Sequence, residues 1–311
     1  MLFDTVTKVV GYADSKEEFS NYVQALHDDL AFYHKLFDIY NDYEGINNIK
    51  TINDYAGIRP VVVDDKIIDL LKLGQQAYAL SDGQVNIAMG AVLKIWHEHR
   101  EQATRDPASA SIPSLDALME AAKHIDIENM IIDEQNRTVF LQDPAMSLDV
   151  GGIAKGYATE CVVKHAVERG FTDGIASVGG NIRAFGLKEK PDTPWSIGIQ
   201  SPISSQPDLF TVRITDASVV SSGGYSRYYT VKGKRYHHII DPHTLMPADY
   251  FDLVTVICDD SGMADILSTA VFTMPFQDGL ALIESLDDTE ALWVFKDGNM
   301  EYSSGFEALL L

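Results

Sequence analysis

The spacing of apolar and polar residues near the start of the chain predicts a long amphipathic helix. Between Ser15 and Tyr40, apolar residues recur every three or four positions and would form one face of a helix. Residues 15–18 fit a capping box, in which a serine and a glutamate satisfy backbone N–H groups at the helix start. The same periodicity predicts a second helix from Asp64 to Leu80, ending near Gly83.

Most of the remaining chain consists of short apolar runs bounded by turn residues, which predict strands. Residues 129–133 and 138–141 are expected to form a hairpin. Extended segments are also expected at 3–12, 175–178, 182–185, 195–200, 209–214, 218–222, 227–231, 253–258 and 290–295. The pattern predicts helices at 114–124, 150–169, 263–274 and 279–285, and a loop rich in Ala, Ser and Pro at 101–113.

This order of elements favours an α+β fold. Strands that follow one another in hairpin-like succession, with helices grouped between them, indicate a largely antiparallel sheet with packed helices rather than alternating βαβ units. No break in composition marks a linker, so residues 1–311 are predicted to form a single domain.

The charge of the chain narrows the classes of partner. Lys and Arg number 24 against 46 Asp and Glu, which gives a formal net charge of −22. Nucleic acids and anionic lipid surfaces require a basic footprint, so neither is an expected partner. Cys161 and Cys258 lie in apolar surroundings without CxxC spacing and are expected to be buried, reduced thiols.

The sequence also suggests a compartment. No apolar run is long enough to span a membrane, so no transmembrane segment is expected. Residues 1–4 have neither the basic region nor the apolar stretch of a signal peptide. The sequence as it stands therefore predicts a cytoplasmic protein. A shortened form of an exported, membrane-anchored protein remains the alternative.

The stretch from Asp149 to Ala158 is the strongest local candidate for a binding site. An apolar run stops at Gly151 and Gly152, and a helix-favouring stretch with Lys155 follows. Two glycines at a strand-to-helix turn allow a close backbone approach, and free N–H groups at a helix start attract phosphate. A tight turn that only packs a helix closely is the alternative.

Two further clusters carry titratable groups. His237 and His238 would point to opposite faces of an extended segment, so one of them could donate to a phosphate or move a proton. Asp241, before a proline, would start a turn. Alternatively, the cluster is a strand that runs into a turn with a surface histidine.

The third cluster lies in the helix predicted at 263–274. Asp265 and Thr269 are four residues apart and would share a helix face. A carboxylate and a hydroxyl oxygen form the hard ligand pair that suits Mg²⁺. A structural explanation is also open, because Asp favours helix starts and Thr can bond back to a carbonyl.

Taken together, these clusters resemble the ApbE family of flavin transferases over nearly the whole chain. Residues 149–158 match the family's Asp-x-Gly-Gly-Ile-Ala-Lys-Gly-Tyr-Ala core. The other matching stretches, in the family's order, are 3–5, 83–90 with Trp96, 177–181, 195–199, 222–225, 238–242 and 264–270. The resemblance implies an α+β fold of the T-fold-like type.

The resemblance also implies an activity. Family members bind FAD with Mg²⁺, split its pyrophosphate, and transfer FMN through a phosphoester to a Thr or Ser of a target protein, with release of AMP. Carried over by residue, the metal ligands would be Asp265, Thr269 and the carbonyl of Ala154, with Ser268 as a fourth. The catalytic residues would be Lys155, Asp265 and His238, although the base that deprotonates the acceptor hydroxyl could be either His238 or an acid near the metal. The residues implied to contact FAD are Phe3, Asn86, Ile87, Ala88, Gly151, Lys155, Tyr157, Gly180, His238 and Asp241.

Two other functions stay open at this point. Some relatives hydrolyse FAD to FMN and AMP, and a non-catalytic FAD-binding protein would use the same binding residues. Departures from the family pattern bear on the choice between these functions and the transferase. Val85-Asn86 stands where the family has Phe-Asp, and Ala88 stands where a threonine is common. These differences would reshape the pocket for the adenine or isoalloxazine ring.

Overall fold

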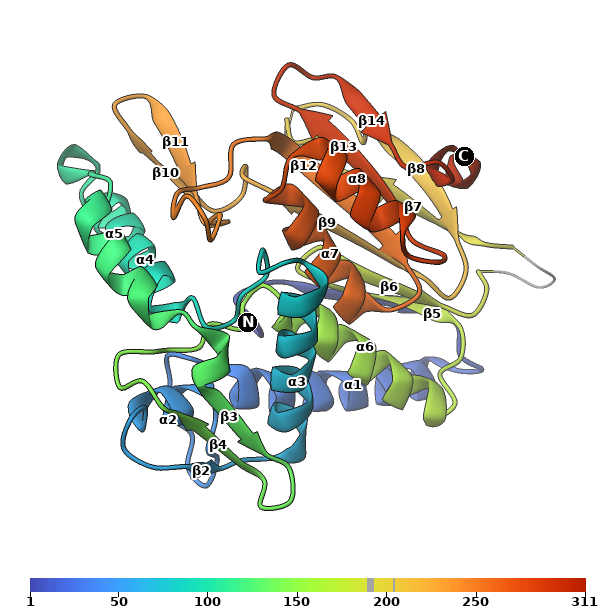
Figure 1. The fold of residues 1–311 in the computed structure, drawn as a ribbon. Helices are drawn as coiled ribbons and strands as arrows, with labels where there is room; N and C mark the ends of the chain where they lie inside the picture. Colours follow the sequence, from blue (N-terminus) through green and yellow to red (C-terminus); the bar gives the residue numbers. More distant parts are fainter. Residues whose placement is uncertain (189–192, 204) are drawn as a thin grey trace. The chain divides into compact units, whose positions relative to one another are not determined.

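The computed structural model describes residues 1–188, 193–203 and 205–311, and they fold into two compact units (Figure 1). Unit 1 comprises residues 1–34, 153–223 and 250–311, and unit 2 comprises residues 35–152 and 224–249. Each unit is assembled from segments that are distant in the sequence. The single domain over 1–311 stays a prediction.

Unit 1 is built on one large antiparallel sheet. Seven strands pair in the order β1-β5-β6-β9-β12-β13-β14, and every neighbouring pair is antiparallel. Their bounds are β1 Thr7–Gly11, β5 Gly174–Val178, β6 Asn181–Phe185, β9 Ser218–Gly223, β12 Phe251–Cys258, β13 Glu290–Phe295 and β14 Met300–Tyr302. Strands β7 (Trp195–Ile199) and β8 (Phe210–Ile214) form a separate pair. This sheet confirms the predicted α+β class.

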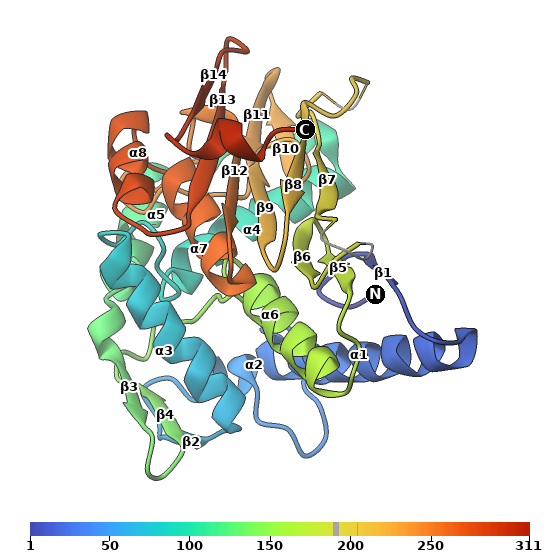
Figure 2. The same cartoon turned by 90° about the vertical axis from the view of Figure 1, so that its right-hand side faces the viewer.

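Helices cover the sheet of unit 1. Helix α6 (Ala154–Glu168) contacts β5 and β6, and α7 (Ser261–Phe272) contacts β6, β9 and β12. Helix α8 (Phe276–Glu284) packs on β13 and on α7 (Figure 2). Helix α7 is buried along most of its length, so burial of its apolar side chains holds it against the sheet.

Unit 2 combines helices with small sheets. Its helices are α2 Ile49–Asp54, α3 Asp65–Leu80, α4 Gly90–Arg105 and α5 Leu115–Ala121, and helix α1 (Lys16–Phe37) begins in unit 1 and ends here. Strands β2 (Val61–Val62), β4 (Thr138–Leu141) and β3 (Met130–Asp133) form one sheet, and β10 (Tyr228–Val231) pairs with β11 (Lys234–His237). Short 3-10 turns lie at Pro107–Ser109, Ala122–His124, Ile127–Asn129 and Phe306–Leu309, the last of them in unit 1.

A buried tryptophan organises part of unit 2. Trp96 of α4 packs with Met89, Leu118 and Tyr229 in one apolar cluster. Its indole N–H donates to the carbonyl of Leu245 at 3.0 Å. The cluster joins α4, α5 and the β10–β11 hairpin, although they are far apart in the sequence.

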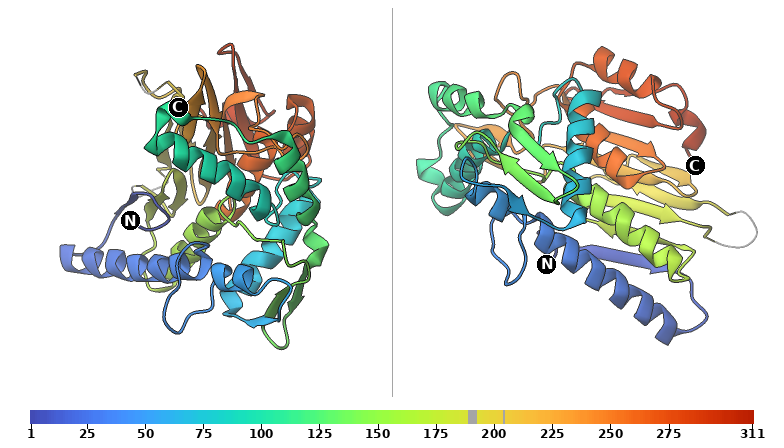
Figure 3. Two further views of the ribbon diagram at one scale, coloured as in Figure 1. Left: turned by 90° about the vertical axis from the view of Figure 1, so that its left-hand side faces the viewer. Right: turned by 60° about the horizontal axis from the view of Figure 1, so that its bottom comes forward.

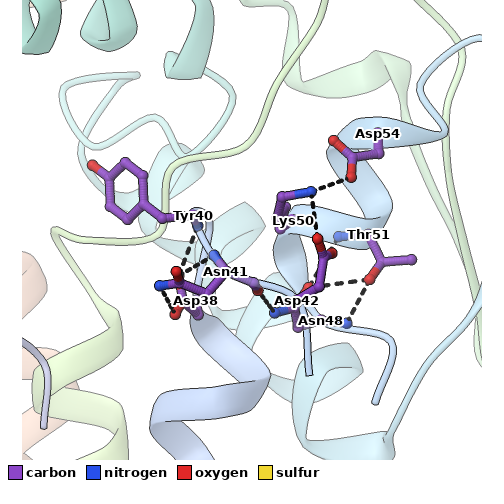
Figure 4. A network of polar contacts seen from close by, with 8 residues as sticks. All are labelled: Asp38, Tyr40, Asn41, Asp42, Asn48, Lys50, Thr51 and Asp54. Carbon is purple, nitrogen blue, oxygen red and sulfur yellow. Dashed lines mark hydrogen bonds and ion pairs between the residues drawn. The ribbon is translucent and has the colours of Figure 1, made fainter. Parts of the chain in front are cut away.

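The loop between α1 and α2 is held by polar contacts (Figure 4). The buried carboxylate of Asp38 accepts hydrogen bonds from the backbone N–H groups of Tyr40 and Asn41, at 2.7 and 3.1 Å. Burial alone would raise the pKa of Asp38, but these bonds and those from the Asn41 and Tyr43 side chains outweigh it and lower the pKa. At the start of α2, Asn48 and Thr51 form a capping box.

Several predicted boundaries were wrong for local reasons. The first helix ends at Phe37 rather than Tyr40, because residues 38–41 turn around the Asp38 carboxylate. The predicted loop at 101–113 was wrong in its first part, since α4 continues to Arg105. The predicted extended segment at 3–12 begins only at Thr7, because Leu2 and Thr5 close a turn.

The helix expected at 150–169 begins at Ala154, because residues 151–153 form the turn that precedes it. The helices predicted at 263–274 and 279–285 start earlier, at Ser261 and Phe276. Among the described residues, no helix combines the length and apolarity needed to cross a bilayer.

Candidate functional site

The candidate site of unit 1 lies where α6 and α7 touch (Figure 3, right). Gly156 makes this close approach possible, because a Cβ at that position would lie 2.3 Å from the carbonyl oxygen of Ser261 and 2.4 Å from Cβ of Asp265. Any larger residue would push the helices apart. The glycine within the Lys155-Gly156-Tyr157 motif is therefore required for packing between helices.

Asp265 of α7 lies at the N-terminal end of α6. Its side chain is buried, and its Oδ2 accepts a hydrogen bond from the backbone N–H of Gly156 at 2.9 Å. No side chain of the residue before α6 caps that helix, so a carboxylate from another helix takes the capping role. Lys155 Nζ lies 3.8 Å from the same oxygen. A carboxylate at a helix N-terminus beside a cation is electrostatically favourable.

The remaining oxygens of this region differ in how they are engaged. Asp265 Oδ1 and the hydroxyl of Thr269, one turn later on α7, make no hydrogen bond with any residue that the structure describes. Ser268 is fully buried, and its hydroxyl donates to the carbonyl of Asp265 at 3.1 Å and bonds with Ser222 Oγ at 2.9 Å. Ser268 is thus occupied by structural contacts, whereas Asp265 and Thr269 keep oxygens available for a ligand.

Ala154, whose carbonyl is the third implied metal ligand, is the first residue of α6 and is buried. Within the described part of the chain, no group of three or more His, Cys, Asp and Glu side chains could hold a metal. A cation here would rest on one carboxylate, hydroxyl and main-chain oxygens and water, which is the hard, partly hydrated environment that Mg²⁺ accepts.

Two residues that the sequence analysis did not select complete the contact between the helices. Glu160 of α6 is buried, and its Oε2 accepts from the N–H of Ser261 at 2.8 Å. Arg183 of β6 donates to the same Oε2 at 3.0 Å. The only local signal for Glu160 was a charged residue within a helix of small and apolar residues, and its partner lies 101 positions away.

Three other predicted contact residues also belong to unit 1. Gly180 has a left-handed φ of 96°, and a Cβ there would meet nothing within 4 Å, so the turn is open. The next residue, Asn181, is buried, and its Nδ2 has no partner among the described residues. Tyr157 is half-buried and meets Tyr33 edge to face. Phe3, also at positive φ, donates its N–H to His34 Nδ1 at 3.3 Å.

The other predicted contact residues lie in unit 2, and several have local roles. Asn86 Oδ1 accepts from Ala88 N at 2.8 Å, which forms a turn. Ile87 and Ala88 are both buried, and a contact of either with FAD stays a prediction. Gly151 N donates to Asp149 Oδ1 at 2.9 Å, and Asp149 N donates to the carbonyl of Ile87 at 2.9 Å. The glycine turn and the 86–88 segment are therefore joined within this unit.

The two adjacent histidines differ, as the alternation of an extended segment predicts. His237 is buried; its Nε2 lies 2.8 Å from the carbonyl of Ala248, and its Nδ1 accepts from Ile239 N at 3.2 Å. His238 is partly exposed, and its Nδ1 lies 3.3 Å from the carbonyl of Arg227. Since a carbonyl only accepts, Nδ1 carries the proton in that contact.

Asp241 is buried and serves the turn that follows it. Its Oδ1 accepts from the N–H groups of His243 and Thr244 at 2.8 and 3.3 Å. The predicted turn at this position is confirmed, and a contact with FAD stays a prediction.

The cysteines do not provide a nucleophile. Cys161 and Cys258 are both free thiols, as predicted. Burial raises the pKa of Cys161 and raises the pKa of Cys258 to about 12, so both remain protonated at neutral pH. Cys258 is buried as predicted, whereas Cys161 is only partly so.

Comparison with known proteins identifies the class of protein to which this fold and site belong. A protein of Klebsiella pneumoniae (strain 342) named FAD:protein FMN transferase is 32% identical over 289 residues, which is 89% of this chain and 86% of that protein. A protein of Treponema pallidum with the same name is 33% identical over 271 residues, covering 83% and 73% of the two chains. The similarity is thus to flavin transferases and spans most of both chains.

Solved structures of ApbE proteins have the same fold as this chain. The crystal structure of the ApbE protein of Thermotoga maritima has a TM-score of 0.88 and 28% identity, and the match covers 99% of this chain and 97% of that one. The flavin transferase ApbE of Vibrio cholerae shares the fold, with a TM-score of 0.80 at 22% identity over 100% and 97% of the chains. The model of the ApbE family matches residues 3–293. The chain belongs to the ApbE family.

Proposed function

We propose that this protein is an FAD:protein FMN transferase that uses Mg²⁺ to move FMN from FAD to a Thr or Ser hydroxyl of an acceptor protein, releasing AMP. Membership of the ApbE family and relatives that bear this enzyme name support the reaction. The observation that carries the site is the buried Asp265, held at the start of α6 beside Lys155 with one carboxylate oxygen available.

The residues present fit a bound Mg²⁺. Asp265 Oδ1 and the Thr269 hydroxyl are hard oxygen donors one helical turn apart, and neither has a partner among the described residues. The carbonyl of Ala154 would complete the protein ligands, with Ser268 close by in sequence but already hydrogen-bonded. When bound, the metal would polarise the pyrophosphate oxygens and neutralise their charge.

The chain's own residues would supply the remaining electrostatic stabilisation. Lys155 carries a mobile positive charge at the start of α6 and lies near Asp265 in this structure. Because the chain is strongly acidic overall, a pyrophosphate must be held by such local groups rather than by the general charge. Lys155 would therefore bind phosphate oxygens and stabilise the charge that develops during transfer.

The transfer itself is a substitution at the FMN phosphorus. The acceptor hydroxyl oxygen forms the new P–O bond, the bond to the bridging oxygen breaks, and AMP leaves with the bridging oxygen. A base must take the hydroxyl proton. His238 is our candidate, because an imidazole can accept a proton near neutral pH, and an acidic residue near the metal is the alternative. The implied FAD contacts of Phe3, Asn86, Ile87, Ala88, Gly151, Tyr157, Gly180 and Asp241 belong to the same proposal.

The direct test is incubation of the purified protein with FAD, Mg²⁺ and a candidate acceptor, followed by gel fluorescence and AMP measurement. Covalent fluorescence on the acceptor with equimolar AMP supports the transferase. AMP without label on any acceptor favours FAD hydrolysis to FMN and AMP. Bound FAD without metal-dependent AMP release would indicate a non-catalytic flavin-binding protein. The compartment in which the protein acts stays a prediction from the sequence.

A further inference from the structure

We propose that Glu160 and Arg183 are positioning residues for the Asp265 carboxylate, acting through the N-terminus of α7. This inference rests on the proposed function, since it assigns a role in the same metal site. It adds two residues that lie outside the set implied by the family resemblance.

The contact between α6 and α7 is reciprocal. Asp265 of α7 accepts from Gly156 N near the start of α6 at 2.9 Å, and Glu160 of α6 accepts from Ser261 N at the start of α7 at 2.8 Å. In each helix the donor lies four residues before the acidic residue, so donor and acceptor occupy adjacent turns of one face. The two hydrogen bonds therefore fix both the separation and the axial register of the helices.

Glu160 is itself anchored. Arg183 Nε donates to the same Oε2 at 3.0 Å, and Lys164 Nζ lies 3.3 Å from Oε1. Arg183 belongs to β6 in the sheet, so the pair connects α7 to the sheet as well as to α6. A buried carboxylate with three donors has little freedom to move.

The register of α7 sets the position of Asp265. Without the bond from Glu160 to Ser261, α7 could slide or rotate at its first turn, one turn before Asp265. Asp265 Oδ2 would still attract Gly156 N, but Oδ1 and the Thr269 hydroxyl would no longer be held in a single arrangement. Residues that orient a metal ligand typically contribute roughly tenfold to metal affinity.

The test uses Glu160→Met, which is close to glutamate in length but has no oxygen to accept from Ser261 N or from Arg183. Arg183→Gln is the second variant and leaves Glu160 in place, so one variant remains if the other does not fold. Glu290→Met is the matched control, because Glu290 of β13 likewise accepts from a backbone N–H, that of Gly305, at 3.0 Å, which lies outside both helices. Urea unfolding reports the stability of each protein.

The measurement is Mn²⁺ binding by EPR titration in the absence of FAD, together with the Mg²⁺ concentration that gives half-maximal AMP release. We expect Glu160→Met to weaken Mn²⁺ binding and to raise that Mg²⁺ concentration by roughly tenfold, with a smaller shift for Arg183→Gln and none for Glu290→Met. Unchanged Mn²⁺ affinity in both variants, with Asp265→Ala losing it, would overturn the positioning role and leave the proposed function standing. Wild-type protein that binds no Mn²⁺, or Asp265→Ala that binds it normally, would overturn the metal site itself.

Discussion

The backbone N–H of Gly156 donates to the carboxylate of Asp265 at 2.9 Å, across 109 positions of sequence. This hydrogen bond joins the start of α6, which carries Lys155 and Gly156, to helix α7 near the C-terminal end of the chain. It requires a glycine, because the helices meet backbone to backbone at this point.

The first prediction concerns this glycine. Alanine is intrinsically the better helix residue by about 1 kcal/mol, so Gly156→Ala would stabilise an isolated helix. Here the added Cβ would lie 2.3 Å from a main-chain oxygen, which cannot move aside as a side-chain end can. We expect the steric clash to outweigh the gain in helix propensity, so that Gly156→Ala lowers the free energy of unfolding by about 1–3 kcal/mol. Urea denaturation measures this change.

Gly151→Ala is the control for that measurement. Gly151 belongs to the same motif, but an added Cβ would meet only the carboxylate oxygen of Asp149, at 3.0 Å. We expect its stability to stay close to that of the wild type. Equal losses for the two variants would contradict the packing role of Gly156.

The second prediction concerns His238. If it removes the proton from the acceptor hydroxyl, FMN transfer slows at acidic pH as the imidazole becomes protonated. His238→Gln should lower the transfer rate by about 10²–10⁴-fold and should remove the acid limb of the pH–rate profile. The neighbouring His243→Gln, at an exposed position, should leave both unchanged. A His238→Gln profile that keeps its acid limb would exclude this residue as the base.

The third prediction concerns the pH dependence of stability. Hydrogen bonds lower the folded-state pKa of Asp38 below its ordinary value of 3.8. A lowered carboxyl pKa contributes stability that is fully present above the unfolded pKa and is lost as pH falls through the folded one. Asp38→Asn should therefore cost about 1–3 kcal/mol at pH 7, with the difference from wild type shrinking below about pH 4.

Urea midpoints at pH 7 and pH 3 provide this comparison, with the exposed Asp116→Asn as control. A difference between Asp38→Asn and wild type that persists unchanged at pH 3 would show that the charge of Asp38 does not stabilise its loop.

Local patterns in the sequence predicted much of the fold because they depend on neighbouring residues. The helix predicted from Asp64 to Leu80 forms over Asp65–Leu80, with Asp64 as its N-cap, and the hairpin at residues 130–141 forms as predicted. Helix α4 was not predicted, because its second half is polar and its buried face is recognisable only from the packing of Trp96 against the β10–β11 hairpin.

In the candidate site, too, local relationships could be predicted from the sequence and long-range contacts could not. That Asp265 and Thr269 share one helix face followed from their spacing of four residues. That Glu160 accepts from Ser261 N at the start of α7 could not be predicted, since their contact crosses 101 positions and involves a backbone N–H that carries no sequence signal. Long-range pairing of a side chain with a helix start depends on tertiary packing, which a local pattern does not encode.

The central claim is that the Asp265 carboxylate supports FMN transfer, and Asp265→Asn tests it most directly. An asparagine can keep the hydrogen bond from Gly156 through its amide oxygen but removes the negative charge. The measurement is intact-protein mass spectrometry of an acceptor after incubation with FAD, Mg²⁺ and either wild-type or Asp265→Asn protein of equal folded fraction. The account predicts an acceptor that gains one FMN with wild type, and a rate at least about a hundredfold lower with the variant. Equal FMN addition by both proteins would contradict it.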